Sequence, residues 1–293
     1  MAATDTPNIP DSSPPSRPSP VPPRALSFDR AAAQYGTARP GYPDALLDAV
    51  EELAGRPLRG SRTLDIGAGT GISTRRLHDR GARVVAVEPG PGMAAELRRT
   101  LPDVPLVRGD GNRLPFAAAS ADLITYAQSW HWTDPTRSAP EALRVLRPGG
   151  ALALWWNVAD DTVPWIAEQD ARLRRFFGAE ARTKAGPEAH TEARTEAAPA
   201  TPKRTEATGA HGSPVHGRDL PPELTFVHRR VPWTRCVPLA THLANLGSHS
   251  AFLILGDEPV RRFLSEEREH LAPHFPDGTV EETYVVDLNV AIR

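Results

Sequence analysis

The stretch that decides the fold is Leu64-Asp-Ile-Gly-Ala-Gly-Thr-Gly71, in which glycines alternate after a short apolar run. Residues 63–66 predict a strand that enters a tight turn, and residues 70–80 predict the helix that leaves it. Gly67 and Gly69 let the backbone turn sharply and approach a ligand where a Cβ atom would block it. The N–H groups at the start of the following helix favour a carboxylate or a phosphate as that ligand.

Predicted strands and helices alternate on both sides of this turn. Further strands are expected at residues 83–88, 105–108, 122–126, 151–156, 224–233 and 283–292. Helices are expected at residues 43–55, 91–100 and 135–146, in a stretch that ends near Phe177, and at residues 239–246 and 258–271. The segment Pro148-Gly149-Gly150 predicts a sharp stop before the fifth strand. The alternation predicts an α/β fold with a parallel sheet and helices on both faces.

Composition divides the chain into a tail and one domain that carries an insertion. Residues 1–24 are rich in Pro, Ser and Asp, and we expect disorder because they cannot bury enough apolar surface to offset the entropy of ordering. Residues 178–221 lack large apolar side chains over most of their length, and we expect the same of them. The single domain, residues 25–293, is expected to comprise a lid and helix at 25–60, a core at 61–177, this insertion, and strands with a helical cap at 222–293.

Charge and cysteine content exclude several classes of protein. The formal net charge is −2, which does not favour a nucleic-acid or anionic-membrane partner. We expect a cytoplasmic protein, because no apolar run approaches a membrane span and the N-terminus does not have the pattern of a secretory signal. Cys236 is the only cysteine, so no internal disulfide is possible, and we expect it to be packed in a strand. The histidines of the insertion are too scattered to predict a metal site: His190, His211 and His216.

Two acidic residues narrow the choice of ligand. Glu88 ends the second strand, where its carboxylate can accept hydrogen bonds from the two hydroxyls of a ribose. The dinucleotide fingerprint requires its third glycine at the position of Ile72. Asp65 at the entrance of the turn would repel a pyrophosphate and attract an ammonium group. These residues favour a ribose-bearing cofactor with an amino-acid end. A nicotinamide-dependent oxidoreductase and a non-catalytic cofactor-binding protein remain alternatives, although no Tyr-x-x-x-Lys pair supports the former.

The segment at residues 64–71, together with these acidic residues, resembles motif I of the class I S-adenosylmethionine-dependent methyltransferases. Within that class it resembles the methyltransferase type 11 family. Later segments resemble further motifs of that superfamily: Asp110, Leu114-Pro-Phe116, Asp122-Leu-Ile124 and Leu143-Arg-Val-Leu-Arg-Pro-Gly-Gly150. Phe28, Tyr35 and Arg39-Pro-Gly-Tyr-Pro43 resemble the branch of trans-aconitate methyltransferase-like enzymes. The resemblance covers about residues 28–177. It implies a seven-stranded Rossmann-like sheet with an antiparallel last strand, and S-adenosyl-L-methionine as the cofactor.

The resemblance also implies which residues contact the cofactor. Asp110 would accept a hydrogen bond from the adenine amino group, Gly111 would pass close to the ring, and Met93 would pack on its face. Tyr35 and Arg39 would fold over the methionyl end as part of an N-terminal lid. The remaining expected contacts are Asp65, Gly67, Ala68, Gly69, Glu88, Pro89 and Gln128.

The segment Gln128-Ser-Trp130-His131-Trp132 follows the fourth strand and therefore lies at the same rim as the glycine turn. Its aromatic residues either pack on the sheet edge or surround the sulfonium methyl group by cation–π attraction. Of Trp155 and Trp156, at most one is expected to line the pocket, because adjacent residues of a strand face opposite sides.

His131 is the candidate catalytic residue, because it can accept a proton from a hydroxyl or amine acceptor. Positioning can supply most of the acceleration of methyl transfer, and a carboxylate acceptor needs no base. The branch resemblance favours O-methylation of a carboxylate or hydroxyl on a small molecule, and the near-neutral charge argues against a nucleic-acid acceptor.

Overall fold

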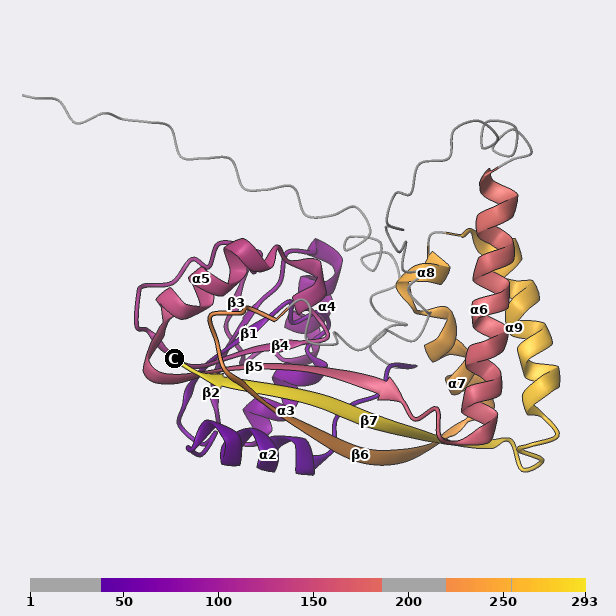
Figure 1. Ribbon diagram of the computed structural model, residues 1–293, viewed down its shortest axis with the longest axis horizontal. Coiled ribbons are helices and arrows are strands. Elements are labelled where there is room, and N and C mark those ends of the chain that lie inside the picture. Colours follow the sequence, from indigo (N-terminus) through magenta and orange to yellow (C-terminus); the bar gives the residue numbers. More distant parts are fainter. Residues whose placement is uncertain (1–37, 186–219, 254) are drawn as a thin grey trace, which may run out of the picture.

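The computed structural model describes residues 38–185, 220–253 and 255–293, which contain a seven-stranded sheet of order β3-β2-β1-β4-β5-β7-β6 (Figure 1). Strands β1 to β5 are parallel, and β7 is antiparallel to both of its neighbours. The expected Rossmann-like sheet with an antiparallel last strand is therefore confirmed. The strands are β1 (Arg62–Ile66), β2 (Arg83–Val87), β3 (Leu106–Val107), β4 (Ala121–Ala127), β5 (Leu146–Ala159), β6 (Phe226–Pro238) and β7 (Thr279–Ile292).

Helices cover both faces of the sheet. Leu123 and Ile124 are adjacent on β4 and enter different core clusters, as the two-residue period of a strand requires. The first cluster includes side chains from α2 (Asp44–Ala54), α3 (Ile72–Asp79) and α4 (Pro91–Thr100), and the second includes side chains from α5 (Pro135–Val145). Helices α3, α4 and α5 each connect two parallel strands that are neighbours in the sheet. Of these, α3 and α4 lie on the same face as α2.

The remaining helices form a cap at one end of the sheet. They are α6 (Pro164–Ala185), α7 (Leu239–Gly247), α8 (Ser250–Leu253) and α9 (Asp257–Leu271). Figure 1 shows them together beyond the core, where β5, β6 and β7 extend towards them. Leu243 of α7 and Leu271 of α9 pack with Val280 of β7, so the cap is anchored on the extended end of the sheet.

Some boundaries differ from those expected. Helix α3 begins at Ile72 rather than at residue 70, because the left-handed backbone at Gly69 and Gly71 prolongs the turn. The Pro148-Gly149-Gly150 segment lies inside β5 and does not precede it. Helix α6 continues past Phe177 to Ala185, into the range assigned to the insertion.

The predicted disordered tail, Phe28, Tyr35 and the three insertion histidines lie outside the described residues. Among the residues that are described, no helix is both long and apolar enough to cross a membrane.

The environments of several residues also differ from expectation. Cys236 is exposed on β6 and is not packed. Trp130 is fully buried, with its ring edge-on to Tyr126 at a centroid distance of 4.8 Å. It is therefore a core residue that cannot surround a methyl group without exposing the core. Trp155 and Trp156 are both buried, and they pack in opposite core clusters.

Candidate cofactor and acceptor site

The glycine turn after β1 is closely packed at one glycine and open at another. Gly67 and Gly69 have φ angles of 67° and 59°, a left-handed conformation that glycine adopts at little cost. A Cβ atom on Gly67 would stand 2.5 Å from Cβ of Ser129, so the turn lies directly against the end of β4. At Gly69 no described atom outside the glycine and its two chain neighbours lies within 4 Å of the corresponding position. The backbone at Gly69 thus has the free space that a ligand passing over the turn requires.

Glu88 connects this turn to the end of β2. Its Oε2 accepts a hydrogen bond from the Gly69 N–H at 2.8 Å, and its Oε1 accepts one from the Gly90 N–H at 2.7 Å. The Gly67 N–H donates to the carbonyl of Val87 at 2.8 Å, beside the same connection. The carboxylate is 6% exposed and lies at the carboxyl end of the parallel strands, where open α/β sheets bind their ligands.

Asp65 lies beneath the turn and is fully buried. Its Oδ2 accepts from the Thr74 hydroxyl at 2.7 Å, and its Oδ1 accepts from the Thr125 hydroxyl at 2.8 Å. Burial raises the pKa of Asp65 from 3.8 to about 6, although these hydroxyl hydrogen bonds lower it. Its hydrogen-bond partners in the described chain are neutral, so a nearby cation would stabilise the ionised form. The ammonium group of a methionyl end has the required charge.

The end of β4 contributes a strained residue at the rim, by which we mean the edge of the sheet where the parallel strands have their carboxyl ends. Gln128 has a φ angle of 54°, which is uncommon for a residue other than glycine, and such backbone costs about 1–3 kcal/mol. The strained backbone is held by the Gln128 N–H, which donates to the Trp155 carbonyl at 2.8 Å. The side-chain amide of Gln128 donates to the Tyr42 hydroxyl at 3.4 Å. Tyr42 is thereby joined to the rim, a role that sequence reasoning did not assign to it.

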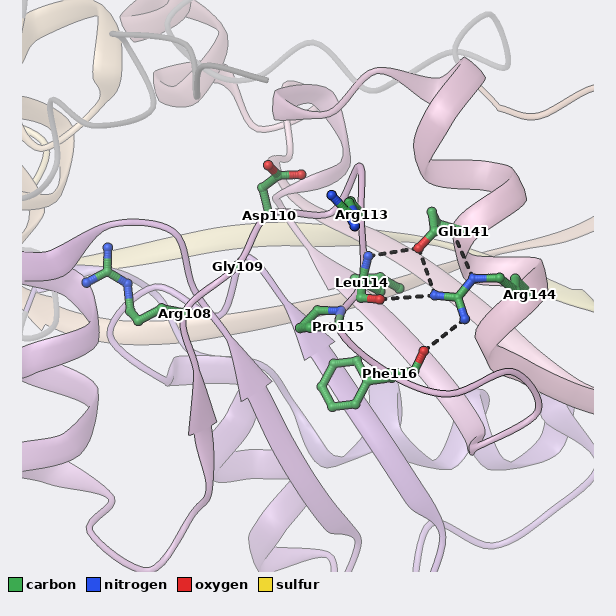
Figure 2. Close-up of a pocket in the computed structure, with 9 residues that line it drawn as sticks. All are labelled: Arg108, Gly109, Asp110, Arg113, Leu114, Pro115, Phe116, Glu141 and Arg144. Carbon is green, nitrogen blue, oxygen red and sulfur yellow. Dashed lines mark hydrogen bonds and ion pairs between the residues drawn. The ribbon is translucent and has the colours of Figure 1, made fainter. Parts of the chain in front are cut away.

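Asp110 follows β3 and lines a cavity of about 580 Å³ (Figure 2). Its Oδ1 accepts from the N–H of Asn112 at 2.7 Å, which fixes the turn beside it. Across the cavity, the ion pair of Glu141 and Arg144 is bonded to the backbone of Leu114, as Figure 2 shows. The charged side chains of that wall thus already have partners within the wall. We therefore expect a ligand to bind at the side of the cavity formed by Asp110.

Gly111 and Met93, which were expected near the adenine, are both buried. A Cβ atom on Gly111 would stand 2.9 Å from Thr133 Cγ2, so the chain after Asp110 passes very close to its neighbours. Ala68 and Pro89 are half-buried beside the glycine turn and the end of β2. The guanidinium of Arg39 donates to the carbonyl of Ser248 at 3.0 Å, and it therefore reaches the cap.

His131 lies in the short 3₁₀ helix η2 (Trp130–Trp132) and is exposed. Its Nδ1 accepts a hydrogen bond from the indole N–H of Trp156 at 3.3 Å. The hydrogen bond specifies the tautomer, because a neutral imidazole that accepts at Nδ1 carries its hydrogen on Nε2. In the described chain, no group of three or more His, Cys, Asp or Glu residues is arranged to hold a metal ion.

Sequence reasoning missed the residues that hold the predicted site residues in place. Thr125 pairs with Asp65 in the register of β4 and β1, and Ser129 donates to the carbonyl of Ile66. A signal for Thr125 did exist, because it is a polar residue inside an apolar strand. Its partner could not be predicted, because the pairing depends on the register of the two strands.

The strand order, the open glycine turn and the acidic residues at two strand ends define a class I methyltransferase that uses S-adenosylmethionine. The model of the methyltransferase domain family matches residues 64–154. An uncharacterized methyltransferase of Mycobacterium tuberculosis is 35% identical over 254 residues, which cover 85% of this chain and 87% of that protein. The chain therefore belongs to the S-adenosylmethionine-dependent methyltransferases, and its cofactor is S-adenosyl-L-methionine.

Two further similarities are informative. The structure of a protein from Anaeromyxobacter dehalogenans, assigned as a type II methyltransferase, superposes with a TM-score of 0.60 at 25% identity, covering 87% of this chain and 97% of that chain. A demethylmenaquinone methyltransferase of Beutenbergia cavernae is 44% identical over 123 residues, which are 41% of this chain and 48% of that protein. The chain thus matches less than two thirds of the latter protein.

The raised pKa of Asp65 leads to a pH-dependent stability. An acid whose pKa is higher in the folded chain stabilises the fold at low pH, and this contribution is lost as the pH rises through about 6. Between pH 4 and pH 7.5 we expect the free energy of unfolding of the wild type to fall by up to about 3 kcal/mol relative to Asp65→Asn. Urea denaturation at both pH values measures this difference. Parallel pH dependence of the two proteins would contradict the assignment.

Proposed function

We propose that the chain methylates an oxygen atom of a small-molecule acceptor, and a carboxylate in preference to a hydroxyl. The observation that carries this proposal is the hydrogen bond from Trp156 to Nδ1 of His131. It leaves the imidazole with its hydrogen on Nε2, so the ring offers a donor rather than a base. A carboxylate is already ionised at neutral pH and accepts such a hydrogen bond, whereas a hydroxyl has a proton to lose.

The proposed cofactor site follows the carboxyl ends of the strands. The methionyl end would lie over the glycine turn near Asp65, the ribose at Glu88, and the adenine beside Asp110. The bound cofactor supplies a methyl group on a sulfonium, which makes the sulfur a good leaving group. The residues proposed to hold it are Tyr35, Arg39, Asp65, Gly67, Ala68, Gly69, Glu88, Pro89, Met93, Asp110, Gly111 and Gln128.

With such an electrophile, the contribution of the protein is mainly to bring the acceptor oxygen into line and to exclude water. The buried residues that contact the rim support this positioning role. Ser129 closes against Gly67, and the backbone of Gln128 is held in its strained conformation by Trp155. Rigid support of this kind is what positioning catalysis requires.

A nucleic acid and a quinone are the alternative acceptors. The near-neutral formal charge of −2 does not favour a nucleic acid. The similarity to a demethylmenaquinone methyltransferase makes a quinone the second candidate, and it is included in the test below. Nothing supports the alternative function of a nicotinamide-dependent oxidoreductase, because the chain belongs to the methyltransferases.

The acceptor class is tested by methyl transfer from S-adenosylmethionine labelled in its methyl group. The full-length protein is incubated with separate pools of di- and tricarboxylic acids, phenols, amines and a demethylated menaquinone. We expect label in the carboxylic-acid pool, and we expect mild alkali to release it as methanol, because methyl esters hydrolyse under conditions that ethers survive. Alkali-stable label, or label only in the amine or quinone pool, would overturn the proposal.

The role of His131 is tested by comparing His131→Ala with His131→Gln, which retains a donor near the position of Nε2. Loss of one hydrogen bond to a charged oxygen costs about 1.5–3 kcal/mol. We therefore expect the KM for the acceptor to rise at least about tenfold in the alanine variant and less in the glutamine variant, with kcat nearly unchanged in both. A fall in kcat of about 100-fold or more, with loss of a pH limb near 6.5, would instead identify His131 as a base.

A further inference from the structure

A buried run of charged and polar side chains joins the cap to the sheet. Its centre is Glu282 on β7, which is 2% exposed. The carboxylate contacts Nδ1 of His242 at 2.7 Å, accepts from the Tyr284 hydroxyl at 3.0 Å and is paired with the guanidinium of Arg235. Burial alone would raise the pKa of Glu282, but His242 and Arg235 outweigh it and hold the pKa below its usual value. Glu282 is therefore a buried carboxylate on which β6, β7 and α7 converge.

Arg235 extends this network to residues 38–42, which we call the N-terminal segment. Its Nη2 donates to the carbonyl of Ala38 at 2.9 Å, and its Nη1 donates to the carbonyl of Arg39 at 3.2 Å. One guanidinium thus holds the carboxylate of Glu282 on one side and two main-chain carbonyls on the other. These carbonyls are nearly 200 residues away in sequence, so the contact is set entirely by the tertiary fold.

A second route from Glu282 reaches the same segment. Tyr284 stacks on Trp233 with ring centroids 5.3 Å apart, and the Trp233 indole N–H donates to Oδ1 of Asn157 at 3.0 Å. The amide of Asn157 then donates to the carbonyl of Gly41 at 3.0 Å. The two routes hold the backbone of the segment at both ends, from β6 and from β5.

The N-terminal segment leads directly to the rim of the site. It ends at Tyr42, whose ring is edge-on to Trp155 and whose hydroxyl accepts from the side chain of Gln128. It also follows the residues expected to form the lid, among them Tyr35. The position of the segment therefore affects the rim.

We propose that Arg235 and Glu282 are positioning residues, which fix residues 38–42 against the rim and so make cofactor affinity depend on this ion pair between β6 and β7. This inference rests on the proposed function for the placement of the cofactor at the rim. It concerns neither the methyl group nor the acceptor, and its structural part can be measured without either.

The charge balance explains why both residues are needed. A guanidinium that met only carbonyl groups in a half-buried position would leave its charge uncompensated, which is costly at low dielectric. Glu282 supplies the compensating charge and thereby allows Arg235 to donate to the segment. Glu282→Gln keeps the shape of the side chain and removes that charge. Arg235→Lys keeps the charge and removes the planar fork that reaches Glu282 and both carbonyls together.

Glu267 on α9 offers a matched control within the same cap. It is 1% exposed, and it binds the guanidinium of Arg172 through two hydrogen bonds of 2.7 Å. It also accepts from Gln169 at 2.9 Å, and Gln169 lies 2.9 Å from the other ring nitrogen of His242. Glu267 is thus as buried and as well paired as Glu282, but its own hydrogen bonds go to α6 and do not reach residues 38–42.

The experiment compares the full-length wild type with Glu282→Gln, Arg235→Lys and Glu267→Gln. Hydrogen exchange of the backbone amides in residues 38–47 is followed by mass spectrometry, and binding of S-adenosylmethionine is measured by calorimetry. For Glu282→Gln and Arg235→Lys we expect exchange at least about tenfold faster and cofactor binding at least about tenfold weaker. For Glu267→Gln we expect a lower Tm, with exchange at residues 38–47 and cofactor binding within about twofold of the wild type.

Equal effects of the two glutamate substitutions on exchange and binding would overturn the proposal, because the network would then serve only to hold the cap together. If Glu282→Gln does not fold, Arg235→Lys decides alone, and unchanged exchange in that variant overturns the proposal. Faster exchange with unchanged cofactor binding also overturns it, because the position of residues 38–42 would then not affect the cofactor. A wild type that fails to bind S-adenosylmethionine would refute the proposed cofactor placement itself, which distinguishes that failure from the other three.

Discussion

The carboxylate of Glu88 holds the glycine turn and the end of β2 in one arrangement, and the rest of the site depends on it. Both of its oxygens accept backbone N–H groups, from Gly69 and Gly90, at hydrogen-bond distances below 3 Å. The turn can also lie against the end of β4, because Gly67 has no Cβ atom that would clash with Ser129. A buried carboxylate that accepts one backbone amide at each oxygen keeps acceptor capacity for hydroxyl groups, since each oxygen has two lone pairs. The same group that shapes the turn is thus suited to bind a ribose.

Buried charge lies in two separate places in the described chain, one beneath this turn and one on β7. Asp65 lies below the turn with neutral hydroxyl partners, and burial raises its pKa. Glu282 lies on β7 beside the cap, and its partners His242 and Arg235 keep its pKa low. Among the described residues no cationic side chain pairs with Asp65, and a methionyl ammonium can supply that charge, whereas Glu282 is neutralised within the protein. This difference is why we assign a ligand-binding role to Asp65 and a positioning role to Glu282.

Much of the fold could be predicted from local patterns. The helix that begins at Pro91 and the strand after Thr63 follow from spacing, proline and glycine signals, and α4 has the expected bounds. The burial of Trp130 and the exposure of Cys236 could not be predicted, because each depends on which tertiary neighbours meet the residue rather than on its own segment. The pairing of Arg235 with a carboxylate on a neighbouring strand was hidden for the same reason. The site residues identified by the glycine motif remain predictions, although their placement at one edge of the sheet follows from the parallel order of the strands.

The cofactor site depends most directly on Glu88, and calorimetric titration of S-adenosylmethionine into the wild type and Glu88→Gln tests this dependence. The amide of glutamine retains one acceptor oxygen, but its NH₂ group faces a backbone donor and cannot accept from a ribose hydroxyl. We predict saturable binding to the wild type and affinity at least about tenfold lower for the variant, equivalent to about 1.4 kcal/mol. Thermal unfolding of the ligand-free proteins controls for collapse of the turn. Equal affinity of the two folded proteins, or no binding to the wild type, would contradict the assignment of this edge of the sheet as the cofactor site.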